Sequence, residues 1–232
     1  DVPAKYLNSP ETELFHKRQT LYNGHSARAA ARDGATVIVV EGYLDVIAAV
    51  SAGFEGTVAP LGTAMTEEHV HLLWRMSDAP VLCFDGDKAG LKAAERAADL
   101  VLPHLKPGKT VKIATLPDGQ DPDDLIKAHG RAAFAEVIEK ARSLSDMIWS
   151  FETGGLVPEA PEERAALQAR LRERANAIQD STVRFHYNQA FDEKLKAFFA
   201  PLRQGGRDGY RSGRPAYGQS GAYGFPARGT PR

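Results

Sequence analysis

The clearest pattern along the chain is a series of short apolar runs bounded by turn residues. Four of these runs are predicted to be strands: residues 36–40, 57–61, 80–84 and 110–116. Between them, residues 44–52, 66–76 and 89–102 carry apolar positions at helical spacing. Apolar runs without polar alternation are typical of strands that helices cover on both faces. The alternation of strand and helix therefore predicts an α/β fold with a mainly parallel sheet flanked by helices.

The pattern changes beyond Arg131, where apolar positions recur only at helical spacing. Four helices are predicted there: residues 132–141, 143–151, 161–179 and 183–199. The pair Gly154-Gly155 and the nearby Pro158 interrupt this pattern. Because no further strand is expected, this part is predicted to form a small helical bundle appended to the α/β domain.

The last part of the chain has a different composition. Residues 203–232 contain six Arg, one Asp, eight Gly, three Pro and three Tyr, with no apolar periodicity. Such a segment buries too little apolar surface to offset the entropy of ordering it, so it is predicted to be a disordered Gly/Arg-rich linker or tail. A solvated spacer is the simpler interpretation, and contact with nucleic acid through charge and base stacking is the alternative.

Composition excludes several classes of protein. No apolar run approaches the ~18 residues of a membrane-spanning helix, and the first residues lack the pattern of a signal peptide. We therefore expect a cytoplasmic protein without membrane contact. The single cysteine, Cys83, lies in a predicted strand and is expected to pack in the core. The seven histidines share no metal-ligand spacing, so surface or satisfied core positions are expected for them.

Carboxylates follow two of the predicted strands. Glu41 comes directly after the first strand and Asp45 lies in the next helical turn, while Asp85 and Asp87 flank a glycine after the third strand. Ligands bind beyond the carboxyl ends of strands in open α/β sheets, and residues two apart at a strand end point to the same side. Converging carboxylates repel one another unless a cation lies between them. Oxygen-only ligation favours Mg²⁺ or Mn²⁺ over zinc.

A third acidic group follows the fourth strand. Asp121 and Asp123 repeat the two-residue spacing in the segment Asp121-Pro122-Asp123-Asp124. Either residue alone could simply cap the helix expected to begin near Leu125. Three acidic groups after three strands are harder to explain by capping alone.

These motifs resemble the Toprim domain, the metal-binding catalytic fold of bacterial primases, topoisomerases and some nucleases. Its signature is a Glu after one strand and Asp-x-Asp after another, matched here by Glu41 and by Asp85 with Asp87. A more specific resemblance, to the bacterial replicative primases, covers about residues 3–140. Its motifs are Lys5 to Thr12, Phe15-His16-Lys17, Leu61-Gly62-Thr63, Phe84 to Gly90 and Leu116 to Asp123. A type II topoisomerase would instead have Glu-Gly-Asp-Ser at residues 41–44.

The resemblance implies a DNA-directed RNA polymerase, a nucleotidyltransferase that makes short RNA primers on single-stranded DNA during replication. It implies Glu41, Asp85 and Asp87 as catalytic residues. It implies Glu41, Asp45, Asp85, Asp87, Asp121 and Asp123 as ligands of two or more Mg²⁺ or Mn²⁺ ions. Lys5 and Lys17 match basic residues beside the incoming ribonucleoside triphosphate. Outside the motif they would be interpreted as solvated surface lysines.

The expected organisation follows from the same resemblance. Residues 1–30 would be a remnant of the amino-terminal half of the primase core, 31–142 the Toprim domain, 143–200 a helical subdomain and 201–232 the tail. The chain is expected to be a fragment, weakly active or inactive alone, because the basic half of the core would supply most phosphate contacts. The implied partners are single-stranded DNA, ribonucleotides and a replicative helicase bound through a carboxyl-terminal domain, at the nucleoid or replisome. A Toprim nuclease and a metal-free phosphate-binding or scaffolding module remain the alternatives.

Overall fold

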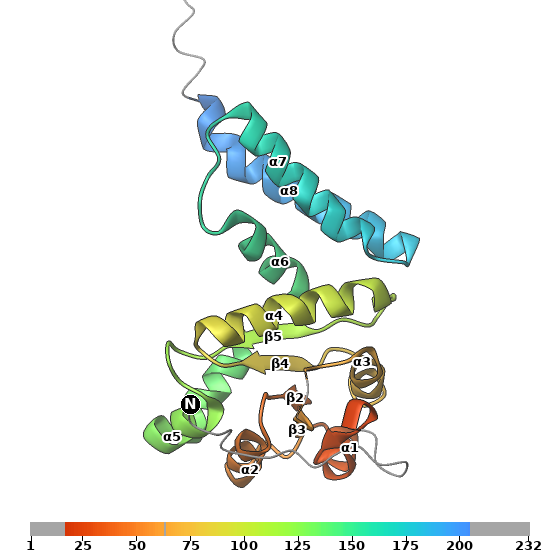
Figure 1. Cartoon of the computed structure of the whole chain (residues 1–232), viewed down its shortest axis with the longest axis vertical. Helices are drawn as coiled ribbons and strands as arrows, with labels where there is room; N and C mark the ends of the chain where they lie inside the picture. The colour runs from red at the N-terminus through yellow and green to blue at the C-terminus, as the bar shows by residue number, and fades with distance from the viewer. Residues whose placement is uncertain (1–16, 63, 205–232) are drawn as a thin grey trace, which may run out of the picture.

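The computed structural model describes residues 17–62 and 64–204. In this part, six strands form one sheet in the order β1-β3-β2-β4-β5-β6. The strands are β1 Leu21–Tyr22, β2 Ile38–Val39, β3 Thr57–Pro60, β4 Val81–Phe84, β5 Lys112–Thr115 and β6 Arg142–Ser143. The four central strands are parallel, and β1 and β6 pair antiparallel at the edges. The predicted mainly parallel α/β sheet is therefore confirmed (Figure 1).

Helices connect and cover these strands. They are η1 Lys17–Gln19, α1 Gly24–Arg32, α2 Tyr43–Ser51, α3 Glu67–Trp74, α4 Lys88–Val101, η2 Leu102–His104, α5 Pro122–Glu139, α6 Leu144–Thr153, α7 Pro161–Asn176 and α8 Ser181–Gln204. The α1 helix was not predicted. The edge strands β1 and β6 were not predicted either, because two residues are too few to show a period.

Helix α5 also begins earlier than the pattern predicted. Pro122 occupies its first position and Asp121 caps it, while Gly130, with a φ of 76°, breaks the helical conformation inside the segment. The helix expected to begin near Leu125 and the helix predicted over residues 132–141 are therefore the two halves of α5, on either side of Gly130.

The two faces of the sheet bury different side chains. Val39 and Leu82 pack with α3 and α4, while their neighbours Ile38 and Val81 pack with α2 and α5. This alternation follows from the pleat of a strand, which sends successive side chains to opposite faces. Cys83 is 1% exposed and belongs to the α2/α5 side, so its expected core position is confirmed.

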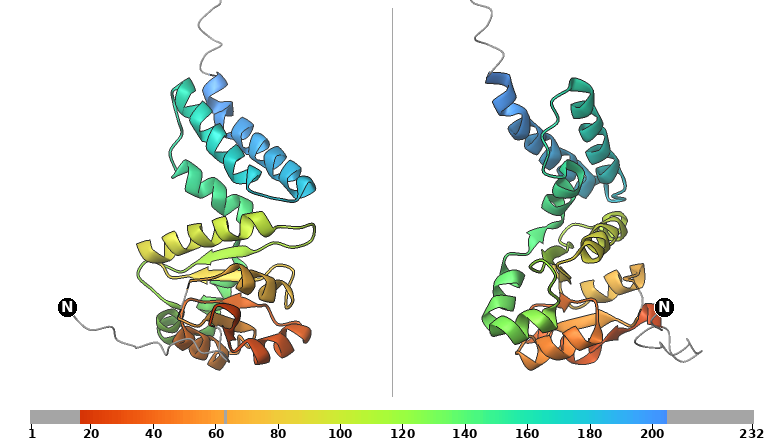
Figure 2. Two further views of the ribbon diagram at one scale, coloured as in Figure 1. Left: turned by 45° about the vertical axis from the view of Figure 1, so that its right-hand side comes forward. Right: turned by 60° about the vertical axis from the view of Figure 1, so that its left-hand side comes forward.

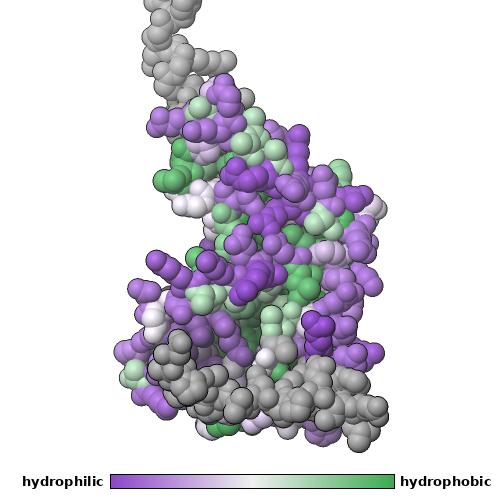
Figure 3. All heavy atoms as spheres, in the orientation of Figure 1, coloured by the Kyte–Doolittle hydropathy of each residue, from purple (hydrophilic) through white to green (hydrophobic). Residues whose placement is uncertain are grey.

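The helices beyond β6 stack on α4 at one end of the molecule (Figures 1 and 2). Their buried leucines, among them Leu144, Leu167 and Leu171, belong to the same apolar cluster as the α4 residues Ala97 and Val101. The predicted bundle therefore shares its core with the sheet domain. In the space-filling view, hydrophobic residues gather at the level of α4 on a face that is otherwise mostly hydrophilic (Figure 3).

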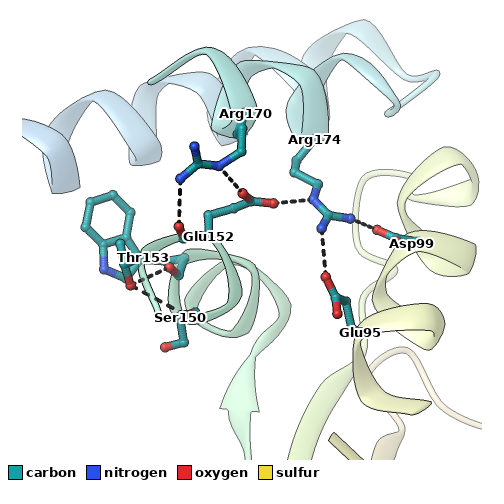
Figure 4. A network of polar contacts seen from close by, with 8 residues as sticks. Glu95, Asp99, Ser150, Glu152, Thr153, Arg170 and Arg174 are labelled. Carbon is teal, nitrogen blue, oxygen red and sulfur yellow. Dashed lines mark hydrogen bonds and ion pairs between the residues drawn. The ribbon is translucent and has the colours of Figure 1, made fainter. Parts of the chain in front are cut away.

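An ion-pair network fastens this contact (Figure 4). Arg174 on α7 donates from Nε to Glu152 Oε1 (2.6 Å) and from Nη2 to Glu95 Oε1 on α4 (3.2 Å), and it also pairs with Asp99. Arg170 donates to the other oxygen of Glu152 and to its carbonyl, at 2.9 and 3.0 Å. The Glu152 side chain is 8% exposed, so its charge is compensated by two guanidinium groups.

No helix in the described ranges is long and apolar enough to cross a membrane. Lys5 and the predicted tail from residue 205 onward lie outside the described residues. Lys17 begins η1, but only its backbone is described.

Candidate metal site at the carboxyl ends of the strands

Strand β2 lies next to β4, with Ile38 opposite Val81 and Val39 opposite Leu82. Strand β5 follows on the other side of β4, with Phe84 opposite Thr115. The loops after these three parallel strands therefore meet at one edge of the sheet. The α2 helix leaves β2 toward one face and α4 leaves β4 toward the other, which creates the crevice where α/β sheets bind ligands. Sequence order alone could not establish that β2 and β4 are neighbours.

The pairing brings the first two acidic groups into contact. The backbone N–H of Asp85 donates to Oε1 of Glu41 over 3.3 Å, although the two residues are 44 positions apart. Glu41 is exposed and Asp85 is partly buried at the strand tip. The Glu41 carboxylate is thus held against the start of the Asp85-Gly86-Asp87 loop.

Two glycines allow the loop after β4 to pack tightly. A Cβ on Gly86 would lie 1.8 Å from the carbonyl oxygen of Pro117, and one on Gly90 would lie 2.2 Å from the carbonyl oxygen of Asp85. Gly86 also exchanges backbone hydrogen bonds with the loop after β5, accepting from Gly119 (2.9 Å) and donating to Gln120 (3.0 Å). The motif Asp85 to Gly90 therefore needs glycine at both positions, a steric role that periodicity did not predict.

Several of the predicted ligands also cap helices. Oδ1 of Asp87 accepts from Gly90 N at the start of α4, and Oδ1 of Asp121 accepts from Asp124 N at the start of α5, both over 2.7 Å. Oδ2 of Asp45 accepts from Gly42 N over 3.1 Å in the first turn of α2. Each cap fixes one carboxylate oxygen near a helix amino terminus. The capping interpretation of Asp121 is therefore correct, and it does not exclude binding through the second oxygen.

Asp123 is placed differently. Its Oδ2 accepts from Lys127 Nζ one helical turn later, over 2.5 Å. Its side chain is only 27% exposed, whereas that of Lys127 is 70% exposed. Of the predicted ligands in the described part, Asp123 is the one with a cationic side-chain partner, so a metal would have to compete with this lysine.

The pKa values show how close these groups are. Burial and then the neighbouring carboxylates of Glu41, Asp45, Asp121 and Asp87 together raise the pKa of Asp85 to about 7. Burial and then the charge of Asp121 raise the pKa of Asp45 to about 6, while the backbone N–H groups of Gly42 and Asp123 oppose the shift. Burial likewise raises the pKa of the Cys83 thiol, so this cysteine stays a neutral core residue.

The carboxylates lie near one another but are not gathered at ligand distances. Among the described residues, the one group of three whose potential ligand atoms all lie within 4.8 Å of one another is Glu67, His71 and His104, elsewhere in the molecule. Mutual repulsion among like charges is the physical reason for an open arrangement. An all-oxygen donor set with excess negative charge is nevertheless what a hard divalent cation requires.

An apolar cavity of about 310 Å³ adjoins Glu41. It lies between the strand ends and α4, and its wall includes Met65, Phe84, Arg96 and Leu100. Sequence reasoning did not identify this cavity, because its lining comes from segments that are distant in the chain.

Comparisons with known proteins agree with this geometry. The family model described as "Toprim domain" matches residues 35–115, and the one described as "DNA primase catalytic core, N-terminal domain" matches residues 1–28. The DNA primase of Rickettsia felis is 44% identical over 191 residues, which are 82% of this chain and 32% of that protein. The chain thus spans about a third of the length of this relative.

Solved structures show the same likeness. A DNA primase domain from Pseudomonas aeruginosa is 40% identical with a TM-score of 0.77, covering 86% of this chain and 61% of that one. A DnaG primase catalytic domain bound to single-stranded DNA is 36% identical with a TM-score of 0.73. The match covers 83% of this chain and 62% of that domain's chain. The fold and its acidic edge define a Toprim domain. The chain is a homologue of the bacterial DNA primases, and what it matches is part of their catalytic core.

Proposed function

We propose that this chain supplies the metal-dependent chemistry of a DNA primase, which joins ribonucleotides into short RNA primers on single-stranded DNA. The observation that carries the proposal is the contact between Glu41 and the Asp85-Gly86-Asp87 loop across β2 and β4. The homologue bound to single-stranded DNA supports that template as a partner. The match of residues 1–28 to the amino-terminal part of the primase core favours a primase over a Toprim nuclease.

The predicted ligands fit a hard divalent cation, Mg²⁺ or Mn²⁺, because every donor is a carboxylate oxygen and the pKa of Asp85 is raised to about 7 by burial and by the neighbouring carboxylates. We assign Glu41, Asp45, Asp85 and Asp87 to this role, with Asp121 and Asp123 as further ligands. Bound cations would activate the 3′-hydroxyl and neutralise the leaving pyrophosphate, as in two-metal polymerases.

The side chains have separate tasks in this proposal. Glu41 is exposed at the strand tip, and the Asp85 N–H orients it, so it can accept a proton from the attacking hydroxyl. Asp87 and Asp121 are oriented by the helices that they cap. Because the pKa of Asp85 is raised to about 7, this group is partly protonated near neutral pH, and cation binding there would release its proton.

The remaining parts of the assignment extend the same proposal. Ribonucleoside triphosphates would meet Lys5 and Lys17, and a replicative helicase would bind a carboxyl-terminal domain of the whole protein. The place of action would be the cytoplasm, at the replisome. The divisions 1–30, 31–142, 143–200 and 201–232 are our proposed domain boundaries, although α4 and the helices after β6 share one apolar cluster.

A chimaeric enzyme tests the function directly. This chain would replace the aligned segment of the Pseudomonas aeruginosa primase, and dinucleotide formation would be measured on single-stranded template with Mg²⁺. We expect Glu41→Gln to lower the rate at least a hundredfold, because the amide keeps the shape but neither binds a cation strongly nor accepts a proton.

The matched control is Asp118→Asn, which removes an exposed carboxylate from the neighbouring loop and should leave the rate unchanged. An inactive wild-type chimaera would contradict the equivalence of the two cores. A Glu41→Gln chimaera as fast as the wild type, with the same circular dichroism, would reject the assignment of Glu41.

A further inference from the structure

A second group of metal-ligating side chains lies away from the acidic edge. Glu67 and His71 are one turn apart on α3, and His104 belongs to η2 after α4. The helix α3 lies at the opposite end of β4 from the start of α4 (Figure 1). The potential ligand atoms of the three residues all lie within 4.8 Å of one another.

The distances in this group match a tetrahedral ion. Glu67 Oε1 lies 3.5 Å from His71 Nε2 and 3.5 Å from His104 Nδ1. In a tetrahedral zinc site with bonds of about 2.0–2.2 Å, neighbouring ligand atoms are about 3.3–3.6 Å apart. In an octahedral magnesium site with bonds of about 2.0–2.1 Å, adjacent ligands are closer, at about 2.9 Å. Two imidazoles and one carboxylate also suit zinc-like ions better than magnesium.

Rigid elements hold these ligands in place. The α3 helix is anchored by the buried residues Val70, Leu73 and Trp74, and the Trp74 indole N–H donates to Thr110 O over 2.8 Å. His104 lies between Leu102 and Leu105, which are 1% and 2% exposed. The two imidazole rings meet edge to face with centroids 5.4 Å apart. Little rearrangement is therefore needed to bring the three donors onto one ion.

The surface beside the histidines is hollowed. A cavity of about 410 Å³ is lined by His71, His104, Lys106 and, from the α7–α8 connection, Gln179 and Asp180. Oδ1 of Asp180 accepts from the N–H groups of Thr182 and Val183, which fixes this carboxylate at the start of α8. An ion on three protein ligands keeps a fourth position for water, and this cavity has room for it.

We propose that Glu67, His71 and His104 bind one Zn²⁺ ion or a similar transition-metal ion with a water as fourth ligand. The ion links α3 to the connection between α4 and β5, on the opposite side of the sheet domain from the carboxylate cluster. Its consequence is structural, because it adds a metal link between two elements that otherwise contact each other through packing and through hydrogen bonds such as that from Trp74 to Thr110.

Calorimetric titration of the whole chain with zinc sulfate tests this site. The titration is done after removal of metals, with Mg²⁺ in excess to occupy the carboxylate cluster. We expect one Zn²⁺ per chain, and a loss of affinity of at least tenfold in each of Glu67→Gln, His71→Ala and His104→Ala. Glu67 and His71 are exposed, so these two variants should fold normally. The matched controls are His25→Ala, which removes an exposed histidine of α1, and Asp85→Asn, and both should bind Zn²⁺ as the wild type does.

Two further readouts report geometry and stability. Bound Co²⁺ should give the intense visible absorption of a four-coordinate ion, and the three variants should lose it. Zn²⁺ at about a hundredfold excess over Kd should raise the Tm by roughly 5–10 °C in the wild type and not in the His71→Ala variant. Absence of saturable Zn²⁺ binding overturns the proposal. Binding that survives in all three variants, or that only Asp85→Asn abolishes, also overturns it.

Discussion

Gly86 and Gly90 determine how close the carboxylates of the acidic edge can come. A side chain at either position would collide with backbone oxygen atoms of Pro117 or Asp85. These contacts fasten the loop after β4 to the loop after β5 and to the first turn of α4. The charged residues are therefore placed by the two glycines between and beside them.

Gly90→Ala gives a direct measure of this packing. Alanine is favoured over glycine inside a helix by about 1 kcal/mol, but its Cβ would lie 2.2 Å from Asp85 O, a backbone atom that cannot rotate away. We expect the collision to dominate and the free energy of unfolding to fall by about 2–3 kcal/mol in urea titration. Gly24→Ala, whose Cβ would be 3.5 Å from its nearest neighbour, is the control and should cost little. An equal effect of the two substitutions would contradict the steric role of Gly90.

Asp85 should make stability depend on pH when no divalent ion is present. Its pKa is about 7 in the folded chain against an ordinary 3.8, because of burial and the neighbouring carboxylates. Between these two values the folded state holds a proton that the unfolded state has lost, so stability falls as pH rises through this window. Asp85→Asn removes this penalty.

We expect the Asp85→Asn variant to be more stable than the wild type at pH 8 by about 1–2 kcal/mol, and about equally stable at pH 4. One pKa unit corresponds to about 1.4 kcal/mol, and partial exposure of Asp85 reduces the full effect. Urea unfolding in EDTA at both pH values measures the difference, and Mg²⁺ at pH 8 should stabilise the wild type more than the variant. If the variant and the wild type differ in unfolding free energy by the same amount at pH 4 and pH 8, the ionisation of Asp85 is not the cause of the difference.

At the scale of elements, Arg174 connects three helices. Its guanidinium contacts Glu152 of α6, and Glu95 and Asp99 of α4, from a position on α7 (Figure 4). The Arg174 side chain is 22% exposed and that of Glu152 is 8% exposed, so solvent compensates little for a lost partner. The network therefore holds the α7–α8 pair against the sheet domain.

Arg174→Met keeps the length of the side chain and removes its charge. We expect the free energy of unfolding to fall by about 1–3 kcal/mol, because Glu152 loses a charged hydrogen-bond partner and retains only Arg170. Hydrogen exchange should increase in α7 and α8 more than in the strands. Arg172→Met, at an exposed position of the same helix, is the control and should change neither quantity. Uniform exchange changes across the chain would show that Arg174 has no local role at this contact.

For the whole molecule, the distribution of charge matters for DNA. The chain has a net charge of −1, yet residues 203–232 contain six Arg and one Asp. The described part carries its acidic edge at the strand ends, so a phosphate backbone would meet repulsion there unless cations are bound. We therefore expect the basic end of the chain to contribute to any affinity for single-stranded DNA that the chain has.

Deletion of residues 205–232 tests this contribution and leaves α8 complete. If three arginines each neutralise a phosphate, the slope of log K against log salt should become shallower by about 2, at roughly 0.7 per contact for single strands. Fluorescence anisotropy with a labelled oligonucleotide between low and moderate salt measures the slope. A tail of equal length with Gln in place of Arg is the control for its length. Equal slopes for the intact and deleted chains would mean that this segment is only a spacer.

The local features of this protein can be predicted from its amino-acid pattern. Apolar runs such as Val37–Val40 and Val81–Phe84 predicted the central strands, because burial on both faces selects short, continuous runs of apolar residues. The acidic residues after these strands predicted an acidic edge, because parallel strands have their carboxyl ends at the same edge of the sheet. The edge strands β1 and β6 were missed, because two residues are too few to show a period.

Which of these features lie in contact depends on the packing of the whole fold. The β3 strand comes between β2 and β4 in the chain but lies outside them in the sheet, so the contact of Glu41 with Asp85 depends on a crossover that no local pattern encodes. His104 of η2 lies near Glu67 and His71 of α3 because these two elements pack together, although the histidines show no ligand spacing in the sequence. Periodicity depends on the neighbours of a residue along the chain. Contacts between segments that are distant in the sequence depend instead on how helices and strands pack their apolar faces.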